Sequence, residues 1–306
     1  MKKIMTMVIM AVSFSVGATG IRQTSLFNRW LTDTSTFFDA EELDRHQSQV
    51  IFYREATAIN GPAVNIYVDG NYHTSLLPEH YKAVVLCAQT HFFSTAFSRA
   101  TNFADKSQGV YFTVPSKQSS FIKVVSGSNG EPEFERVDAV TGKSAVQRMP
   151  PQKQTLSRVA SAGECREKIV LQNFALSAKA LFQNGRADLN GMLEAGKKEM
   201  HDLASDLKRL DPRRISHIVI SGHSAPGESV ATSMKLSAER AKTVLNFLQR
   251  EGVQFPMEVT GYSSQQSLSQ SCAAGNSNDI NSNNIKMKEA CDQSNRRVEV
   301  TVYAIQ

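Results

Sequence analysis

A short polar loop in the last third of the chain carries residue types that could hold a charged ligand. The stretch GHSAPGESVATSMKLSAERA, residues 222–241, runs from a glycine–histidine turn into a helix that we expect to open near Lys235. The first N–H groups of a helix have no partner within the helix and favour anions. On that helix, Arg240 adds a guanidinium that can take a carboxylate through two hydrogen bonds. The pattern is typical of a loop that can hold a small charged ligand.

A second set of reactive residue types lies in the N-terminal half. Cys87 and His91 are four residues apart and Ser94 is nearby, which would place a nucleophile beside a base. The surrounding VVLCAQTHFF is typical of a strand and its exit, not of a helix start that lowers the pKa of a thiol. We therefore expect Cys87 to be buried or disulfide-bonded, and the protein not to be an enzyme.

Metal and cofactor sites are not indicated. His223 has no second ligand at metal spacing, and His217 falls within a predicted strand. The sequence contains no HExxH, P-loop or dinucleotide-binding motif. We expect the protein to need neither a metal nor a cofactor.

The overall composition is that of a globular protein with a mild excess of basic over acidic residues. The chain has 306 residues, a length comfortable for two domains, with 41% hydrophobic and 21% charged residues. The net charge is +5 and the pI is near 9.0. Basic residues occur as pairs such as Arg213-Arg214, without interleaved aromatic residues. This argues against nucleic acid as a partner and favours acidic surfaces or cell-wall polymers.

The first eighteen residues have the three parts of a secretory signal peptide. Lys2 and Lys3 precede an apolar run at residues 4–14, and the small residues of a cleavage site follow at 16–18. An uncleaved anchor is the alternative, but the run is shorter than the roughly 20 residues that span a bilayer. We expect a mature, exported chain that begins near Thr19. Residues 19–49 show no sustained pattern and remain an uncertain N-terminal segment.

The cysteines suggest disulfides, because their number is even and the chain is expected to be exported. Cys272 and Cys291 flank one polar loop and are the natural pair. Cys87 and Cys165 are then left for each other, or they remain free.

The N-terminal half reads as strands. In residues 64–76, apolar and polar residues alternate on both sides of Asp69-Gly70-Asn71, which predicts a β-hairpin. Further β-rich runs extend the pattern, so we predict an antiparallel β-sandwich over 50–125. The hairpin weakly resembles PEGA-like exported β-sandwich modules. Residues 126–166 are rich in Ser, Gly, Pro and charge, and are expected to form a linker with at most one extra strand.

The remainder, 167–306, alternates between two periodicities. Strand-like runs separate two amphipathic helices, one starting at Asn190 and ending before Pro212, the other running from Lys235 to Arg250. The order β-α-β-α-β-β predicts an α/β sandwich with its helices against one sheet. The fold class is therefore α+β overall, with an N-terminal β-sandwich and a C-terminal α/β sandwich.

Several separated motifs of this C-terminal part resemble the OmpA-like peptidoglycan-binding domain family. They are GH after a strand, LSAERAKTVLNFLQREGV, GY, and NRRVEV, in that order, and the Cys272–Cys291 pair also matches a disulfide of some members. The resemblance implies non-covalent binding of the diaminopimelate-containing stem peptide of peptidoglycan. In the family loop, GHTDxxG…NxxLSxxRA, an Asp and the helix Arg hold the ammonium and carboxylate of diaminopimelate.

The family pattern is only half retained here. Arg240 occupies the Arg position, but Ala225 stands where the Asp belongs. Ser224 replaces the Thr, Glu228 the Gly, and Ser233 the Asn. The resemblance also implies that His223 is a structural turn residue beside the site. The candidate ligand-binding residues are His223, Ser224, Ala225, Glu228, Ser233, Arg240, Asn295 and Arg296, with Arg297 as the alternative arginine.

Two functions remain open from the sequence. The first is non-catalytic anchoring to peptidoglycan in the periplasm, at the outer membrane or cell wall, with Glu228 supplying the missing carboxylate. The second is a protein-interaction subunit of a cell-envelope machine, such as a secretion or motility apparatus, in which peptidoglycan binding is weakened or lost. A cell-wall hydrolase that uses Cys87 is a remote third hypothesis.

Overall fold

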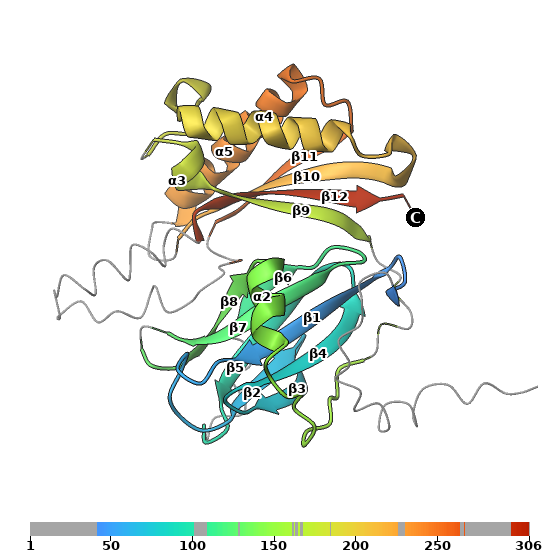
Figure 1. Ribbon diagram of the computed structural model, residues 1–306. Helices are drawn as coiled ribbons and strands as arrows, with labels where there is room; N and C mark the ends of the chain where they lie inside the picture. The colour runs from blue at the N-terminus through green and yellow to red at the C-terminus, as the bar shows by residue number, and fades with distance from the viewer. Residues whose placement is uncertain are drawn as a thin grey trace, which may run out of the picture.

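Two domains stacked on one another make up the protein (Figure 1). The computed structural model describes residues 42–100, 109–127, 129–160, 162, 165, 168–183, 185–225, 230–263, 266 and 295–305. The predicted signal peptide 1–18, most of the segment 19–49, Glu228 and the predicted Cys272–Cys291 bridge lie outside these residues. The N-terminal domain is a β-sandwich, and the C-terminal domain has its sheet toward the sandwich and its helices on the far side.

Two four-stranded sheets form the N-terminal sandwich. The first has the order β4-β1-β7-β8: His80–Cys87, Gln47–Arg54, Ser119–Ser126 and Pro132–Val137. The second has the order β3-β2-β5-β6: Asn71–Leu76, Val64–Val68, Thr90–Phe97 and Val110–Thr113. All neighbouring strands are antiparallel except β1 and β7, which are parallel. The predicted hairpin is confirmed: β2 and β3 pair across Asp69 and Gly70, both at positive φ.

Aromatic and branched side chains fill the space between the two sheets. Phe52 meets Phe93 edge to face at 5.1 Å between ring centroids, and Phe93 stacks on Phe112 at 5.4 Å. Val50, Ile66 and Ile122 are fully buried beside them. Burial of each such side chain stabilises the fold by roughly 1.5–3 kcal/mol before the entropy of ordering is subtracted.

The segment expected as a linker differs from that expectation, because much of it packs on the sandwich. It supplies strand β8 and helix α2, Ala139–Val146, whose N-cap Asp138 accepts hydrogen bonds from the backbone of Val140 and Thr141. Ala145 and Val146 join a second small core on the outer face of the first sheet. The backbone of Gly142 lies against Phe121, where a Cβ would come within 2.3 Å of the Phe121 side chain.

Residues 150–158, here called the strap, then run along the edge strands β3 and β4. The backbone N–H of Gln152 donates to Tyr81 O at 2.7 Å, and that of Arg158 donates to Tyr72 O at 2.7 Å. The buried ammonium of Lys82 donates to Gln152 O and Thr155 O at 3.0 and 3.2 Å. The polar residues that suggested a loose linker therefore satisfy the edges of the two sheets.

The C-terminal domain is one four-stranded sheet with helices on one face. The sheet order is β11-β10-β12-β9: Met257–Ser263, Ile215–His223, Arg297–Ala304 and Val170–Ser177. Strands β10 and β11 are parallel, and the other pairs are antiparallel. The helices are α3, α4 and α5: Ala178–Leu181, Glu194–Lys208 and Val230–Arg250. Two short 3-10 turns, Leu189–Gly191 and Pro212–Arg214, precede α4 and β10.

The predicted order of elements is confirmed, although the predicted first residue of each of the two long helices was wrong by a few residues. Asn190 lies in a 3-10 turn and α4 begins at Glu194, while α5 begins at Val230, earlier than Lys235. Gly252 follows α5 at φ +81°, the left-handed conformation that is typical of a glycine after the C-terminus of a helix. Within the described residues, no helix is long and apolar enough to cross a membrane.

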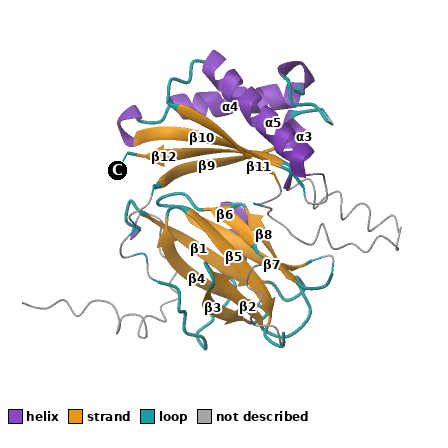
Figure 2. Cartoon of the chain, turned by 180° about the vertical axis from the view of Figure 1, so that it is seen from behind, coloured by secondary structure: helices purple, strands orange, loops and turns teal. Residues whose placement is uncertain are grey.

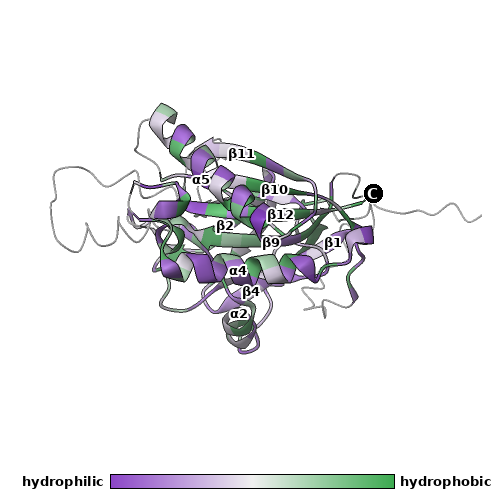
Figure 3. Cartoon of the chain, turned by 90° about the horizontal axis from the view of Figure 1, so that it is seen from above, coloured by the Kyte–Doolittle hydropathy of each residue, from purple (hydrophilic) through white to green (hydrophobic). Residues whose placement is uncertain are grey.

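Helices and sheet bury one apolar core between them. Met200 and Leu207 of α4 and Val244 of α5 lie in one buried cluster with Ile220 of β10 and Val300 of β12. Seen from above, hydrophilic and hydrophobic residues alternate along α4 and α5, as amphipathic helices require (Figure 3).

Helix α5 comes very close to β10 at Gly222. A Cβ on Gly222 would lie 1.9 Å from Ser237 O, so only glycine allows this approach. The end of β10 is thereby held against α5.

Candidate functional site

The candidate site residues fall on two sides of the C-terminal sheet. Ile218, Ile220, Val298 and Val300 point into the core beneath the helices. Because side chains alternate along a strand, His223 and Arg297 point to the opposite face. Figures 1 and 2 show the N-terminal sandwich next to this face.

The residues of β10 and β12 that point away from the helices form a buried polar group. Ser221 pairs with Glu299 in the antiparallel register, and the same register brings His223 opposite Arg297. The Arg297 Nε donates to Glu299 Oε1 at 2.5 Å, and its Nη2 donates to Gln266 O at 3.0 Å. All four of these strand side chains are at most 8% exposed.

Burial and charge set the protonation of this group. Burial, and then the nearby Arg297 guanidinium, lower the pKa of His223 to about 3. Burial alone would raise the pKa of the Glu299 carboxyl, but Arg297, with a smaller effect from Arg136 of β8, brings it below its ordinary value. His223 is therefore neutral and Glu299 ionised at neutral pH.

His223 behaves as a packed structural residue, as the family resemblance implied. Its ring stacks on Tyr262 at 5.4 Å between centroids, with 20° between the planes. Nε2 lies 3.2 Å from Ser221 Oγ, while the buried Nδ1 has no hydrogen-bond partner. A neutral, 1% exposed imidazole cannot act as a cationic group for a ligand.

Arg240 lies on the helix side of the sheet, in the second half of the candidate loop and helix. It is 7% exposed. Its Nε donates to Arg186 O at 3.0 Å, and its guanidinium carbon is 5.7 Å from the centroid of the Phe182 ring. A backbone carbonyl and an aromatic face thus fix the direction of the guanidinium. Arg186 itself forms a two-point ion pair with Asp188.

The remaining candidates are buried around the entrance to α5 and the start of β12. Ser224 and Ala225, directly after β10, are 6% and 1% exposed, and the buried Ser224 Oγ has no hydrogen-bond partner. Ser233 in the first turn of α5 is 1% exposed. Asn295 is fully buried and Arg296 is partly exposed, both immediately before β12.

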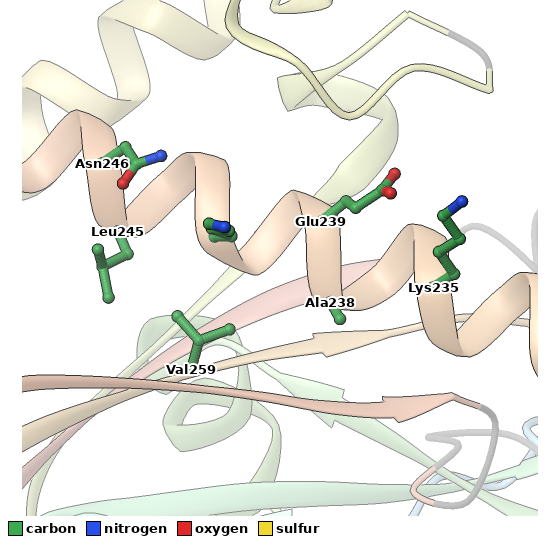
Figure 4. Close-up of a pocket in the computed structure, with 7 residues that line it drawn as sticks. Lys235, Ala238, Glu239, Leu245, Asn246 and Val259 are labelled. Atoms are coloured by element: carbon green, nitrogen blue, oxygen red, sulfur yellow. The ribbon is translucent and has the colours of Figure 1, made fainter.

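Next to this region, a groove of about 490 Å³ separates α5 from the edge strand β11 (Figure 4). Ala238, Leu245 and Val259 supply its apolar walls. Lys235, Glu239, Lys242 and Asn246 line it from the helix.

The reactive residues of the N-terminal half do not form a nucleophilic site. Cys87 is bonded to Cys165, which decides between the two states left open by the sequence. The His91 Nδ1 lies 2.7 Å from Asp69 Oδ2, and its Nε2 lies 2.9 Å from Cys87 O. Both ring nitrogens are thus occupied, and Ser94 Oγ is buried without a partner. The described residues also contain no group of three His, Cys, Asp or Glu side chains that could hold a metal.

The statistical model of the OmpA family matches residues 181–282, which include α4, α5, β10 and the candidate loop. The C-terminal half carries an OmpA-like domain. A curated relative, outer membrane protein A of Serratia odorifera, is 27% identical over 133 residues, or 43% of this chain and 51% of the relative. The chain thus spans about half the length of the curated relative it matches.

Solved structures with a similar OmpA-like part have low overall similarity to this chain. The periplasmic domain of Helicobacter pylori MotB is 18% identical, with 46% of this chain and 84% of that chain covered and a TM-score of 0.34. The cell wall anchor of the T6SS from Pseudomonas aeruginosa is 20% identical, with 45% and 88% covered and a TM-score of 0.33. The peptidoglycan-associated lipoprotein from Burkholderia pseudomallei is 17% identical, with 42% and 88% covered and a TM-score of 0.29.

The sequence did not predict the partners of the OmpA-like domain's arginines. Phe182 and Arg186, which hold Arg240, lie more than 50 residues before it, in a loop without a recognisable motif. Arg297 was the weaker of two candidates, yet its guanidinium is paired with the carboxylate of Glu299. The alternation of Arg297, Glu299 and Thr301 against three buried valines was the signal that places them on one face.

Proposed function

We propose that the protein binds peptidoglycan through its OmpA-like domain and serves as a non-catalytic component of the cell envelope. The observation that carries this proposal is the fixed guanidinium of Arg240 in the middle of α5, the helix that follows the ligand loop. A carboxylate of the stem peptide would meet a cation whose direction is already set by Arg186 O and Phe182. Preorganisation of this kind lowers the entropy lost on binding.

The anionic half of the family's clamp is absent, so weak binding is expected. Ala225 is 1% exposed and offers no acceptor for the ligand's ammonium group. Loss of a charged hydrogen-bond partner costs about 1.5–3 kcal/mol, or roughly ten- to a hundredfold in affinity. Whether Glu228 replaces the lost carboxylate stays a hypothesis, since it lies outside the described residues.

Co-sedimentation with purified sacculi tests the proposal, with NMR titration of a soluble diaminopimelate-containing stem peptide as the second measurement. Arg240→Ala and Arg240→Lys should both reduce binding, Lys less than Ala, because Lys keeps the charge but loses the planar donor pair. Lys242→Ala, two positions on along α5 and exposed, is the matched control and should bind as wild type.

Restoring the family carboxylate gives the opposite test. Ala225→Asp should strengthen binding about tenfold or more, whereas Ala225→Asn, of nearly the same size but uncharged, should not. If neither wild type nor a folded Ala225→Asp variant binds sacculi or the stem peptide, peptidoglycan is not the ligand.

Protein docking in an envelope machine is the second candidate function, and the groove between α5 and β11 favours it. Within the described residues, β11 pairs only with β10, so its other edge has backbone groups available to a partner. Val259 in the groove is 38% exposed, and Met234, on α5 near Gly261 of β11, is 42% exposed. Val259→Lys should disrupt such a contact in a cross-linking assay while leaving sacculus binding unchanged.

We further propose a periplasmic location, supported by the signal-peptide pattern and by the Cys87–Cys165 disulfide. Intact mass of the protein from a periplasmic extract should show a chain that starts near Thr19. A retained Met1 would contradict this.

A further inference from the structure

The sheet face that points away from the helices in the C-terminal domain is both polar and buried. Ser221, His223, Arg297, Glu299 and Thr301 are all at most 8% exposed. In Figures 1 and 2, the N-terminal sandwich lies against this face, with β6 and β8 near β9 and β12. The electrostatic effect of Arg136, on β8, upon Glu299 agrees with this placement.

A contact of this kind is not held strongly by its own side chains. His223 Nδ1 and Arg297 Nη1 are buried without a hydrogen-bond partner. Buried polar atoms without partners oppose the contact, because they have lost water and gained nothing in return. Polar contacts between domains commonly open and close in solution, so the stacking of the two domains needs a further constraint.

Val170 supplies one constraint, at the first residue of β9. Its N–H donates to Ala88 O at 2.8 Å, and its carbonyl accepts from the N–H of Ser116 at 2.7 Å. Nearby, Gln118 Nε2 donates to Gln172 Oε1 at 3.1 Å. These hydrogen bonds therefore join the sandwich to the start of β9, the edge strand of the C-terminal domain.

The Cys87–Cys165 disulfide acts at the same place. Cys87 directly precedes Ala88, and Cys165 precedes Val170 by five residues. The bridge thus tethers β9 to the sandwich beside the very carbonyl that Val170 binds. Without it, the nearest contacts with the sandwich upstream, among the residues that the structure describes, are those of Ala162, whose carbonyl accepts from Gln47 Nε2 at 2.9 Å, and of Arg158 in the strap.

We propose that the Cys87–Cys165 disulfide is a redox-sensitive clamp on the docking of the two domains. With the bridge formed, the polar sheet face stays against the sandwich. With the bridge reduced, the domains separate more often and expose His223 and Arg297. This inference does not depend on peptidoglycan being the ligand.

The chemistry of opening is thiol–disulfide exchange with a dithiol. One thiolate of the dithiol attacks a sulfur of the bridge, breaks the S–S bond and forms a mixed disulfide, which releases the first cysteine thiolate. The second thiolate then attacks the dithiol sulfur of the mixed disulfide and releases the second cysteine thiolate. Cys87 and Cys165 each gain a proton and become thiols, while the dithiol is oxidised to its own disulfide.

Tether length gives the expected size of the effect. The effective concentration of a tethered partner falls roughly as the 3/2 power of tether length. The tether to Val170 lengthens from five residues at Cys165 to eight at Ala162 or twelve at Arg158. The open state should therefore become about two- to fourfold more populated.

Amide hydrogen exchange of the full mature chain, followed by NMR, tests the clamp. The amides of Val170 and Ser116 should exchange about two- to fourfold faster in a Cys87→Ser/Cys165→Ser variant. The amides of Ile66 in the sandwich and Ile220 in the α/β sheet should keep their rates. A Cys272→Ser/Cys291→Ser variant is the matched control and should leave Val170 and Ser116 unchanged. Wild type in a dithiol should behave as the first variant.

A chemical probe gives an independent readout of the face. Diethylpyrocarbonate should modify His223 faster in the Cys87→Ser/Cys165→Ser variant, whereas His201, exposed on α4 on the helix side of the sheet, should react at the same rate. Unchanged exchange at Val170 and Ser116 would overturn the proposal. So would an equal increase at Ile66 and Ile220, because the bridge would then stabilise the whole fold and not the docking.

Discussion

Acidification should destabilise the C-terminal domain through one buried histidine. Burial and Arg297 lower the pKa of His223 to about 3 in the folded protein, against an ordinary value of 6.5. When the pH lies between these two values, His223 therefore binds a proton in the unfolded chain but not in the folded chain. Since the unfolded state binds more protons, stability falls as the pH falls below about 6.5 and continues to fall toward about 3.

The size of the effect follows from the width of that window. Each pH unit within it is worth about 1.4 kcal/mol, so lowering the pH from about 7.5 to about 5 should remove about 2 kcal/mol. This range stays above the ordinary carboxyl values, so Glu299 and other acids add little there. His73, fully buried in the sandwich with a pKa lowered to about 3, should give a similar slope in the other domain.

Urea unfolding monitored by helical circular dichroism measures the C-terminal domain, because α4 and α5 belong to it. His223→Gln should keep a donor near Ser221 but lose the pH-dependent 2 kcal/mol or so between about pH 7.5 and 5. His217→Gln, on the same face of β10 but only partly buried, is the matched control and should retain the wild-type slope. Equal slopes in wild type and His223→Gln would refute the reasoning, since His223 would then be solvated or charged in the folded state.

Two further substitutions test the packing of the site. Gly222→Ala should cost about 3 kcal/mol or more of unfolding free energy, because its Cβ would meet Ser237 O at 1.9 Å. Gly261→Ala is the control and should cost far less, because its Cβ would face the same helix at 3.2 Å from Ala238 Cβ. Thermal denaturation of the two variants measures the difference. Glu299→Gln should lower the free energy of unfolding by about 3–5 kcal/mol, because the Arg297 charge would stay buried without a carboxylate. Asp206→Asn, in an exposed ion pair with Arg209, is the control and should lower it by less than about 0.5 kcal/mol. Urea unfolding measures both. Equal losses within either pair would contradict the packing described here.

Periodicity explains why the architecture could be predicted. The valines at 298, 300 and 302 alternate with polar residues, and the leucines of α4 recur at helical spacing. The buried face of each element can therefore be predicted from its own sequence. The frame around Arg240 was also readable, because LSAERA places it on a helix directly after the ligand loop.

The contacts made by polar residues could not be predicted from the sequence. The strap looked like a linker because it has few apolar residues, yet Gln152 and Arg158 bind sheet edges through their backbones. Glu299 and Thr301 alternate with the valines of β12, a pattern that is also typical of a solvent-facing strand face, but both are buried and the sandwich lies next to this face (Figures 1 and 2). Single-sequence patterns report burial of apolar side chains, and they say little when a buried surface is polar or when the partner lies far away in the chain.

The strap also sets the order in which the chain can fold. Strands β3 and β4 both appear early in the sequence, but the segment that covers their edges comes some 70 residues later, and Cys165 is 78 residues from Cys87. A chain emerging N-terminus first must therefore wait with β3, β4 and the Lys82 ammonium uncovered until residue 158 has emerged. During that interval, the early strands present open edges to neighbouring chains, which is where intermolecular strand pairing begins. That exposure ends when the strap closes, before the C-terminal domain has emerged in full.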